Sequence, residues 1–154
     1  MRVRCISNTS FGLPIALERF GYRGSKQLPL TVGREYIVYA VALLSDQIWY
    51  FIENDDADAL RYPSREPAQL FTVLEGVMSR CWEFAFTPEH GDHLALISFP
   101  EWTRDRFFYD RLTDGQAREV EIFNRRKKSM DMEASGLELV SDGALQESKG
   151  TDTP

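Results

Sequence analysis

The stretch Glu35-Tyr36-Ile37-Val38-Tyr39-Ala40-Val41-Ala42-Leu43-Leu44 decides the fold of this chain. It is rich in β-branched and aromatic residues, which favour an extended backbone. It is apolar at consecutive positions rather than at alternate ones, so both faces of a strand built from it need cover. We therefore predict a central, doubly covered strand over residues 35–44.

The flanking sequence continues the pattern of short strands. Ser45-Asp46 supplies a turn, and residues 47–53 follow as the hairpin partner of the central strand. Further strands are predicted at residues 2–6, 70–74, 81–87 and 94–97, with residues 8–34 and 54–69 as connections rich in turn-forming or polar residues. About six strands with close connections predict an α+β protein that is mainly β, with a small curved antiparallel sheet or barrel.

Aromatic residues are expected in the core of this sheet. The cleanest alternation of the chain lies in residues 81–87, where Trp82, Phe84 and Phe86 share one face. Because most aromatic residues fall on alternating strand faces in this way, we expect them to pack inside the protein.

The periodicity changes after residue 97. Ser98-Phe99-Pro100-Glu101 has the form of a capping box and predicts a helix that runs to about Leu112. Thr113-Asp114-Gly115-Gln116 ends that helix and begins a second one, which runs to about Lys128. Ser, Gly, Asp and Glu then accumulate, so we predict one globular domain over residues 1–133 and a disordered acidic tail over residues 134–154.

Composition excludes several classes of protein. The 154 residues are 43% hydrophobic and 27% charged, which is not the composition of a disordered, collagenous or coiled-coil chain. Residues 1–20 lack the apolar run of a signal peptide, and residues 36–44 are too short for a membrane helix. The two cysteines, Cys5 and Cys81, are too few for a disulfide framework. We expect a reduced, cytoplasmic protein.

The net charge of −6 is concentrated in the middle of the chain. Residues 44–101 contain eleven acidic and three basic residues, whereas residues 1–43 contain two acidic and six basic ones. An acidic chain is a poor general binder of nucleic acid, whose first attraction is to phosphate. The asymmetry favours a basic partner.

Two patterns resemble metal sites incompletely. Asn54, Asp56 and Asp58 fit the first ligand positions of a calcium-binding EF-hand loop, but Ala59 and Arg65 stand where that loop requires Gly and Glu. His90 and His93, with Asp92 between them, have side chains that suit zinc or iron, but the spacing supplies nothing to complete the ligand set. We expect no metal, no cofactor and no catalytic residue. A small metalloenzyme that uses His90, Asp92 and His93 remains an alternative.

Leu30-Thr31-Val32-Gly33-Arg34-Glu35-Tyr36-Ile37-Val38-Tyr39-Ala40 contains the G-x-x-Y-x-V entry common in SH3-like small barrels. With Leu70–Val73, Cys81–Phe84 and Phe107-Phe108-Tyr109, the chain resembles, over residues 30–133, small bacterial immunity proteins of contact-dependent growth inhibition and other polymorphic toxin systems. The resemblance implies an SH3-like β core and a cytoplasmic protein that binds one cognate toxin domain, often a nuclease, and blocks its active site or substrate entry. It transfers no functional residue, because these proteins share no catalytic signature.

A nuclease domain is basic around its substrate channel, so an acidic surface suits its inhibitor. We expect the contact to use acidic loop residues and one aromatic anchor, Trp49, on the strand face opposite Ile48 and Tyr50. The acidic candidates are Glu53, Asp55, Asp56, Asp58, Glu89 and Asp92.

The basic residues offer a second alternative. Arg125-Arg126-Lys127-Lys128 ends a predicted helix, where cations interact favourably with the helix dipole. Together with Arg2, Arg4, Arg23 and Lys26, this run also suits a nucleic-acid-binding or regulatory module on an SH3-like barrel.

Overall fold

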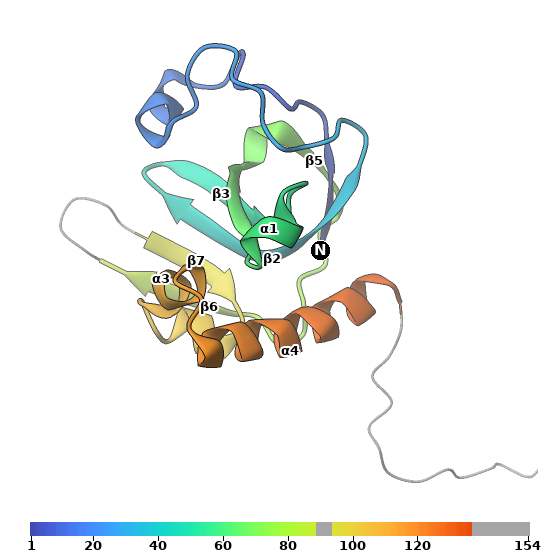
Figure 1. The fold of residues 1–154 in the computed structure, drawn as a ribbon, viewed down its shortest axis with the longest axis vertical. Helices are drawn as coiled ribbons and strands as arrows, with labels where there is room; N and C mark the ends of the chain where they lie inside the picture. The colour runs from blue at the N-terminus through green and yellow to red at the C-terminus, as the bar shows by residue number, and fades with distance from the viewer. Residues whose placement is uncertain (89–93, 137–154) are drawn as a thin grey trace, which may run out of the picture.

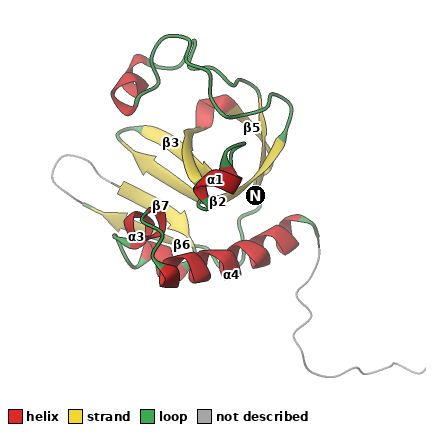
Figure 2. Cartoon of the chain, viewed as in Figure 1, coloured by secondary structure: helices red, strands yellow, loops and turns green. Residues whose placement is uncertain are grey.

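The computed structural model describes residues 1–88 and 94–136. In these residues the chain is α+β and folds around one antiparallel sheet, as predicted (Figures 1 and 2). The strands are β1 (Arg2–Cys5), β2 (Glu35–Leu44), β3 (Gln47–Ile52), β4 (Ser64–Pro67), β5 (Phe71–Glu75), β6 (Glu83–Thr87) and β7 (Leu94–Ser98). The helices are α1 (Ala57–Leu60), α2 (Pro100–Thr103), α3 (Phe108–Thr113) and α4 (Ala117–Ala134), with 3-10 turns η1 (Ile15–Phe20) and η2 (Ala68–Leu70).

Strand β2 is the branch point of the sheet. Its first residues pair with β1, residues 38–44 pair with β3, and residues 41–44 also pair with β7. One series of strands therefore runs β4-β3-β2-β1-β5, and β7 and β6 extend from β2 separately. Along this series β4 and β5 are the two ends, so the described sheet is open.

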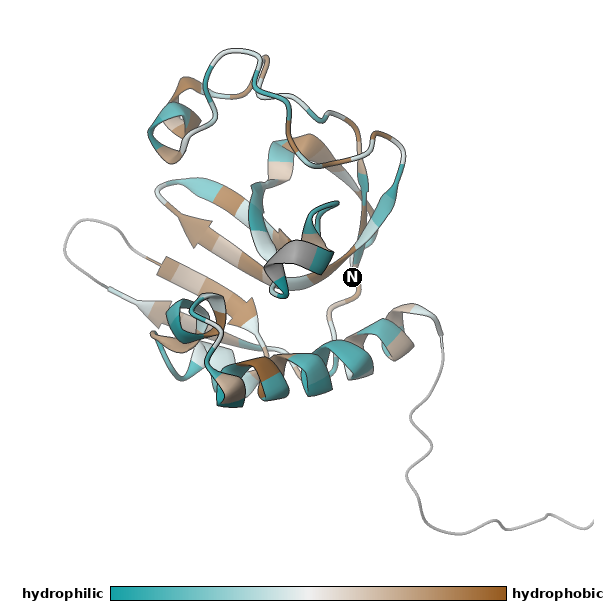
Figure 3. Cartoon of the chain, in the orientation of Figure 1, coloured by the Kyte–Doolittle hydropathy of each residue, from teal (hydrophilic) through white to brown (hydrophobic). Residues whose placement is uncertain are grey.

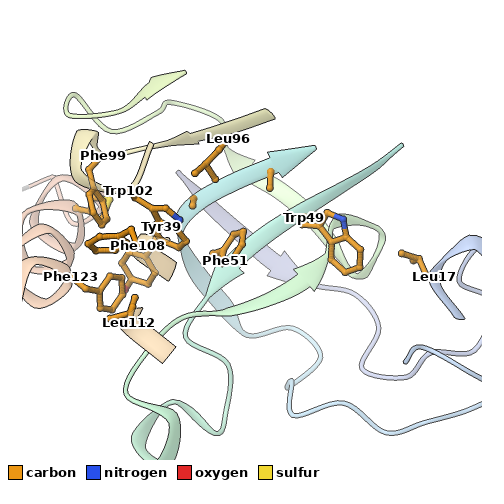
Figure 4. Packing of buried hydrophobic residues seen from close by; sticks show 13 residues of the cluster. Leu17, Tyr39, Trp49, Phe51, Leu96, Phe99, Trp102, Phe108, Leu112 and Phe123 are labelled. Carbon is orange, nitrogen blue, oxygen red and sulfur yellow. The ribbon is translucent and has the colours of Figure 1, made fainter. Parts of the chain in front are cut away.

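Side chains alternate along β2 and β3, so the two faces of these strands pack into two different cores. On one side, Phe51 packs against Trp102 and Tyr109 of the segment that contains α2 and α3, and Trp49 packs against Phe20 and Tyr22 of the N-terminal segment. Val41, Tyr50 and Ile52 pack on the other side, against residues of β1 and β5. Figure 4 shows the first core, in which Phe51 lies between Trp49 on one side and Trp102 and Phe108 on the other. The prediction that both faces of β2 are covered is confirmed for most of its length.

Several element predictions need correction. The helix predicted from residue 98 to 112 is two short helices, α2 and α3, and α4 continues past Lys128 to Ala134. The connection predicted at residues 54–69 contains α1 and β4. The predicted tail lies, from residue 137 onward, outside the described residues. Among the described helices, none combines the length and apolar character needed to span a membrane.

Candidate partner-binding surface

Glu53, at the end of β3, is paired within the molecule. Its carboxylate lies 3.2 Å from Nζ of Lys127 on α4. The same ammonium lies 2.6 Å from Asp131, and Asp131 accepts a hydrogen bond from the Tyr39 hydroxyl at 2.7 Å. Glu53 therefore helps to join α4 to the sheet instead of extending toward a partner.

Asp55 is also held by internal contacts. Its Oδ1 accepts hydrogen bonds from the Tyr36 hydroxyl at 2.8 Å and from Arg34 at 3.0 Å. Its Oδ2 accepts one from Thr31 at 2.7 Å, and its backbone N–H donates to the Pro29 carbonyl at 2.8 Å. Desolvation by burial, together with the nearby carboxylate, raises the pKa of Tyr36. Asp55 thus fastens residues 29–36 to the loop after β3.

Asp56 and Asp58 are the predicted contact residues that the structure leaves accessible. Both are exposed, and neither forms an ion pair with another residue of the described ranges. The backbone N–H of Asp56 donates to Oδ1 of Asn54 at 3.0 Å, which shapes the turn that enters α1. These two carboxylates are available to a basic partner.

The prediction that Trp49 is an aromatic anchor for a partner is wrong. Its side chain is fully buried, with the Phe20 ring edge-on at 5.0 Å and the Arg65 guanidinium 4.7 Å above it. Alternation places Trp49 opposite Ile48 correctly, but the N-terminal segment covers the Trp49 side. The exposed hydrophobic residue is instead Ile48, at 45%.

Four further candidate residues, Glu89, His90, Asp92 and His93, lie outside the described residues. In the ranges 1–88 and 94–136, no group of three or more His, Cys, Asp or Glu side chains is arranged to hold a metal ion.

Exposed phenylalanines on β6 form a surface that the sequence pattern does not predict. Phe84 and Phe86 are 65% and 55% exposed, so the expectation that they pack in the core is wrong. Glu83, on the opposite side of this strand, lies 2.8 Å from Arg104 and accepts a hydrogen bond from Thr103 at 2.6 Å. The helix-facing side of β6 therefore carries Glu83 and Thr87, and the two largely exposed phenylalanines lie on the other side.

Strand register continues this aromatic surface across the sheet. Phe86 is opposite Ala95 on β7, Ala95 is opposite Leu43 on β2, and Leu43 is opposite Ile48 on β3. Directly opposed residues of antiparallel strands share a face, so these side chains form one row. With the neighbouring pair of Phe84 and Ile97, they define the open apolar face: Leu43, Ile48, Phe84, Phe86, Ala95 and Ile97. Figure 3 shows hydrophobic residues along β7, on both faces of the strand taken together.

Internal ion pairs occupy many of the cations of the nucleic-acid-binding alternative. Arg2 contacts Glu75 at 3.1 Å and Glu35 at 3.4 Å, and Arg4 contacts Glu35 at 2.9 Å. Arg126 and Arg125 contact Glu101 at 2.9 and 3.5 Å. Each pair reduces the positive field that phosphate would meet, so the geometry does not favour this alternative.

A buried carboxylate, Glu66 on β4, lies apart from these surfaces. It is 5% exposed and accepts hydrogen bonds from Asn54 at 3.2 Å, Ser64 at 3.0 Å and Tyr22 at 3.1 Å. Burial raises the pKa of Glu66, and the three hydrogen bonds oppose that shift. Because the side chain is enclosed, we assign it to the stability of the fold.

Comparison with known proteins finds no matching family model, no matching curated protein and no matching solved structure.

Proposed function

We propose that this protein is a non-enzymatic immunity protein that binds and neutralises a cognate bacterial toxin domain, a basic nuclease. The observation that carries the proposal is the open apolar face. Its Leu43, Ile48, Phe84 and Phe86 are each between 45% and 65% exposed. They lie on β2, β3 and β6, on one side of the sheet, and β7 joins β2 to β6. Contiguous exposed apolar side chains mark protein-binding sites, and aromatic residues are enriched in the centre of interfaces.

Charge and apolar contact have separate roles in this proposal. The net charge of −6 attracts a basic domain over a distance, and the exposed Asp56 and Asp58 add to that attraction. Such charges mainly raise the association rate, whereas desolvated apolar contact mainly lowers the dissociation rate. The toxin as partner follows from the family resemblance and from this charge.

The β core supports the SH3-like part of the proposal. Strands β1, β2, β3 and β5 contribute residues to one common core, among them Val3, Val38, Ile52 and Phe71. A curved set of short antiparallel strands around a shared core is the arrangement that small barrels use.

The first test is purification of the tagged protein from its native host, with identification of co-purifying molecules and metal analysis of the same sample. We expect one basic toxin domain in equal amount, whose nuclease activity falls when this protein is added. Recovery of nucleic acid alone, or of bound zinc without a protein partner, would support one of the alternatives and overturn the proposal.

The binding kinetics of the recovered pair then locate the contact. Phe84→Ser with Phe86→Ser should raise the dissociation rate at least about tenfold, and Asp56→Lys with Asp58→Lys should lower the association rate and its salt dependence. The matched control is Phe11→Ser with Ile15→Ser, because these residues are 76% and 81% exposed but lie outside the open apolar face. Equal dissociation rates for the Phe84/Phe86 variant and the parent protein would remove this face from the contact.

A further inference from the structure

A cavity lies on the helix-facing side of the sheet, opposite the open apolar face. It has a volume of about 290 Å³ and extends between the strands and the segment of α2 and α3. Its apolar floor includes Ala42 on β2, Ala85 on β6 and Leu96 on β7. Ala42 and Ala85 are small, so the strands leave space that larger side chains would fill.

On the sheet, the lining of the cavity includes Phe51 and Arg65, which lie between two groups of packed residues. On one side, Leu17 and Phe20 of η1 belong to the packing around Trp49. On the other side, Trp102 and Tyr109 stack at 5.3 Å and line the cavity. Figure 4 shows Trp49 and Leu17 apart from Trp102 and Phe108, with Phe51 between them.

Arg65 places a positive charge beside the apolar floor of this cavity. It lies opposite Phe51 in the register of β4 with β3, and its guanidinium is held over the rings of Trp49 and Phe20 at 4.7 and 5.5 Å. It has no acidic partner within the described part of the chain. The nearby Asp105 forms an ion pair with Arg111, so its charge is already balanced.

The rim carries two further charged residues, Arg106 and Asp110. Both are exposed to solvent, which weakens their fields by screening. We therefore assign to the guanidinium of Arg65 the charge that a ligand on the apolar floor would contact.

We propose that this cavity binds a small organic anion: one carboxylate on a single aromatic group or a short branched chain. The carboxylate pairs with Arg65, whose planar guanidinium suits bidentate binding of that group. The apolar body lies over Ala42, Ala85 and Leu96. The small size of the ligand follows from the volume of about 290 Å³, which is just below the range of about 300–1,000 Å³ for small-molecule pockets. This inference is independent of the proposed toxin partner.

The test uses 1-naphthoate as the probe and 1-naphthylmethanol as its uncharged analogue. Calorimetric titration of the full chain should show saturable one-to-one binding of 1-naphthoate and at least about tenfold weaker binding of the alcohol. Methyl resonances of Ala42, Ala85 and Leu96 should shift on addition of the probe, and those of Leu43 and Ile48 should not. Equal affinity for the two probes, shifts confined to Leu43 and Ile48, or no saturable binding at millimolar concentration would each overturn the proposal.

Two variants add a second readout. Arg65→Gln should weaken 1-naphthoate binding at least about tenfold and leave the alcohol unaffected, and Ala85→Leu should weaken binding of both probes by filling the floor. The control, Phe84→Ser with Phe86→Ser, should change neither affinity. If the control variant loses the probe while Arg65→Gln keeps it, the ligand binds at the open apolar face instead. The methyl shifts of the parent protein decide the question even if Ala85→Leu fails to fold.

Discussion

The hydroxyl of Tyr22 donates a hydrogen bond to Oε2 of Glu66 at 3.1 Å and so joins the N-terminal segment to β4. Asn54 and Ser64 donate to the other carboxylate oxygen. Glu66 has three uncharged donors and forms no ion pair in the described ranges, and its burial raises its pKa. An acid whose pKa is raised by folding binds its proton more tightly in the folded state. Protonation of Glu66 therefore stabilises the fold at low pH, and this stabilisation is lost as the pH rises through the raised pKa.

Glu66→Gln should remove this pH dependence. The amide keeps an oxygen for Asn54 and Ser64 and can donate to Tyr22. We expect the free energy of unfolding of the variant, relative to that of the parent, to increase as the pH rises above about 4.5, by about 1.4 kcal/mol for each unit by which folding raises the pKa. Urea denaturation at several pH values measures this difference.

Tyr22→Phe is the matched variant for the same network. It deletes one hydrogen bond to the charged carboxylate, so it should destabilise the fold more at high pH than at low pH. A stability difference that stays constant with pH in both variants would contradict the assignment.

The β2–β3 hairpin shows how far the sequence determines the fold. Its strands were predicted at residues 35–44 and 47–53 and are found at Glu35–Leu44 and Gln47–Ile52, because β-branched residues and a two-residue turn are local signals. Strand β4 has no such signal. Its sequence, Ser64-Arg65-Glu66-Pro67, has low β-propensity, and pairing with β3 holds it in place.

The candidate surface could not be predicted either, because it also depends on contacts between distant parts of the chain and not on a local sequence signal. The alternation in β6 correctly separates Phe84 and Phe86 from Glu83, but it does not say which side is covered. The contact of Glu83 with Arg104, 21 residues later in the chain, belongs to the covered side. A pattern with a period of two residues contains no information about such a distant partner.

Adjacent residues of β3 should respond very differently to substitution. Trp49→Ala removes a fully buried side chain and should lower the free energy of unfolding by about 3–5 kcal/mol. Ile48→Ala, at a position that is 45% exposed, should cost less than about 1 kcal/mol. Urea denaturation compares the two, and similar losses would show that the register of β3 is wrong.

The acidic loop should divide into structural and accessible carboxylates. Asp55→Ala leaves the donors of Thr31, Arg34 and Tyr36 without their acceptor and should lower the free energy of unfolding by about 1–3 kcal/mol. Asp56→Ala removes an exposed carboxylate and should stay within about 0.5 kcal/mol of the parent. Thermal denaturation followed by circular dichroism distinguishes them, and an unchanged melting temperature for Asp55→Ala would return that residue to the surface available to a partner.

Phe84 and Phe86 should be dispensable for folding. Because they are 65% and 55% exposed, replacing both by Ser should change the free energy of unfolding by less than about 1 kcal/mol. Phe99→Ala, at a fully buried position, should cost about 3–5 kcal/mol and serves as the control. The measurement is urea denaturation carried out at two different protein concentrations. A loss above about 2 kcal/mol for the double variant, present only at the higher concentration, would mean that a second copy of the chain covers the open apolar face. A loss of the same size at both concentrations would mean that the two side chains are buried within one molecule.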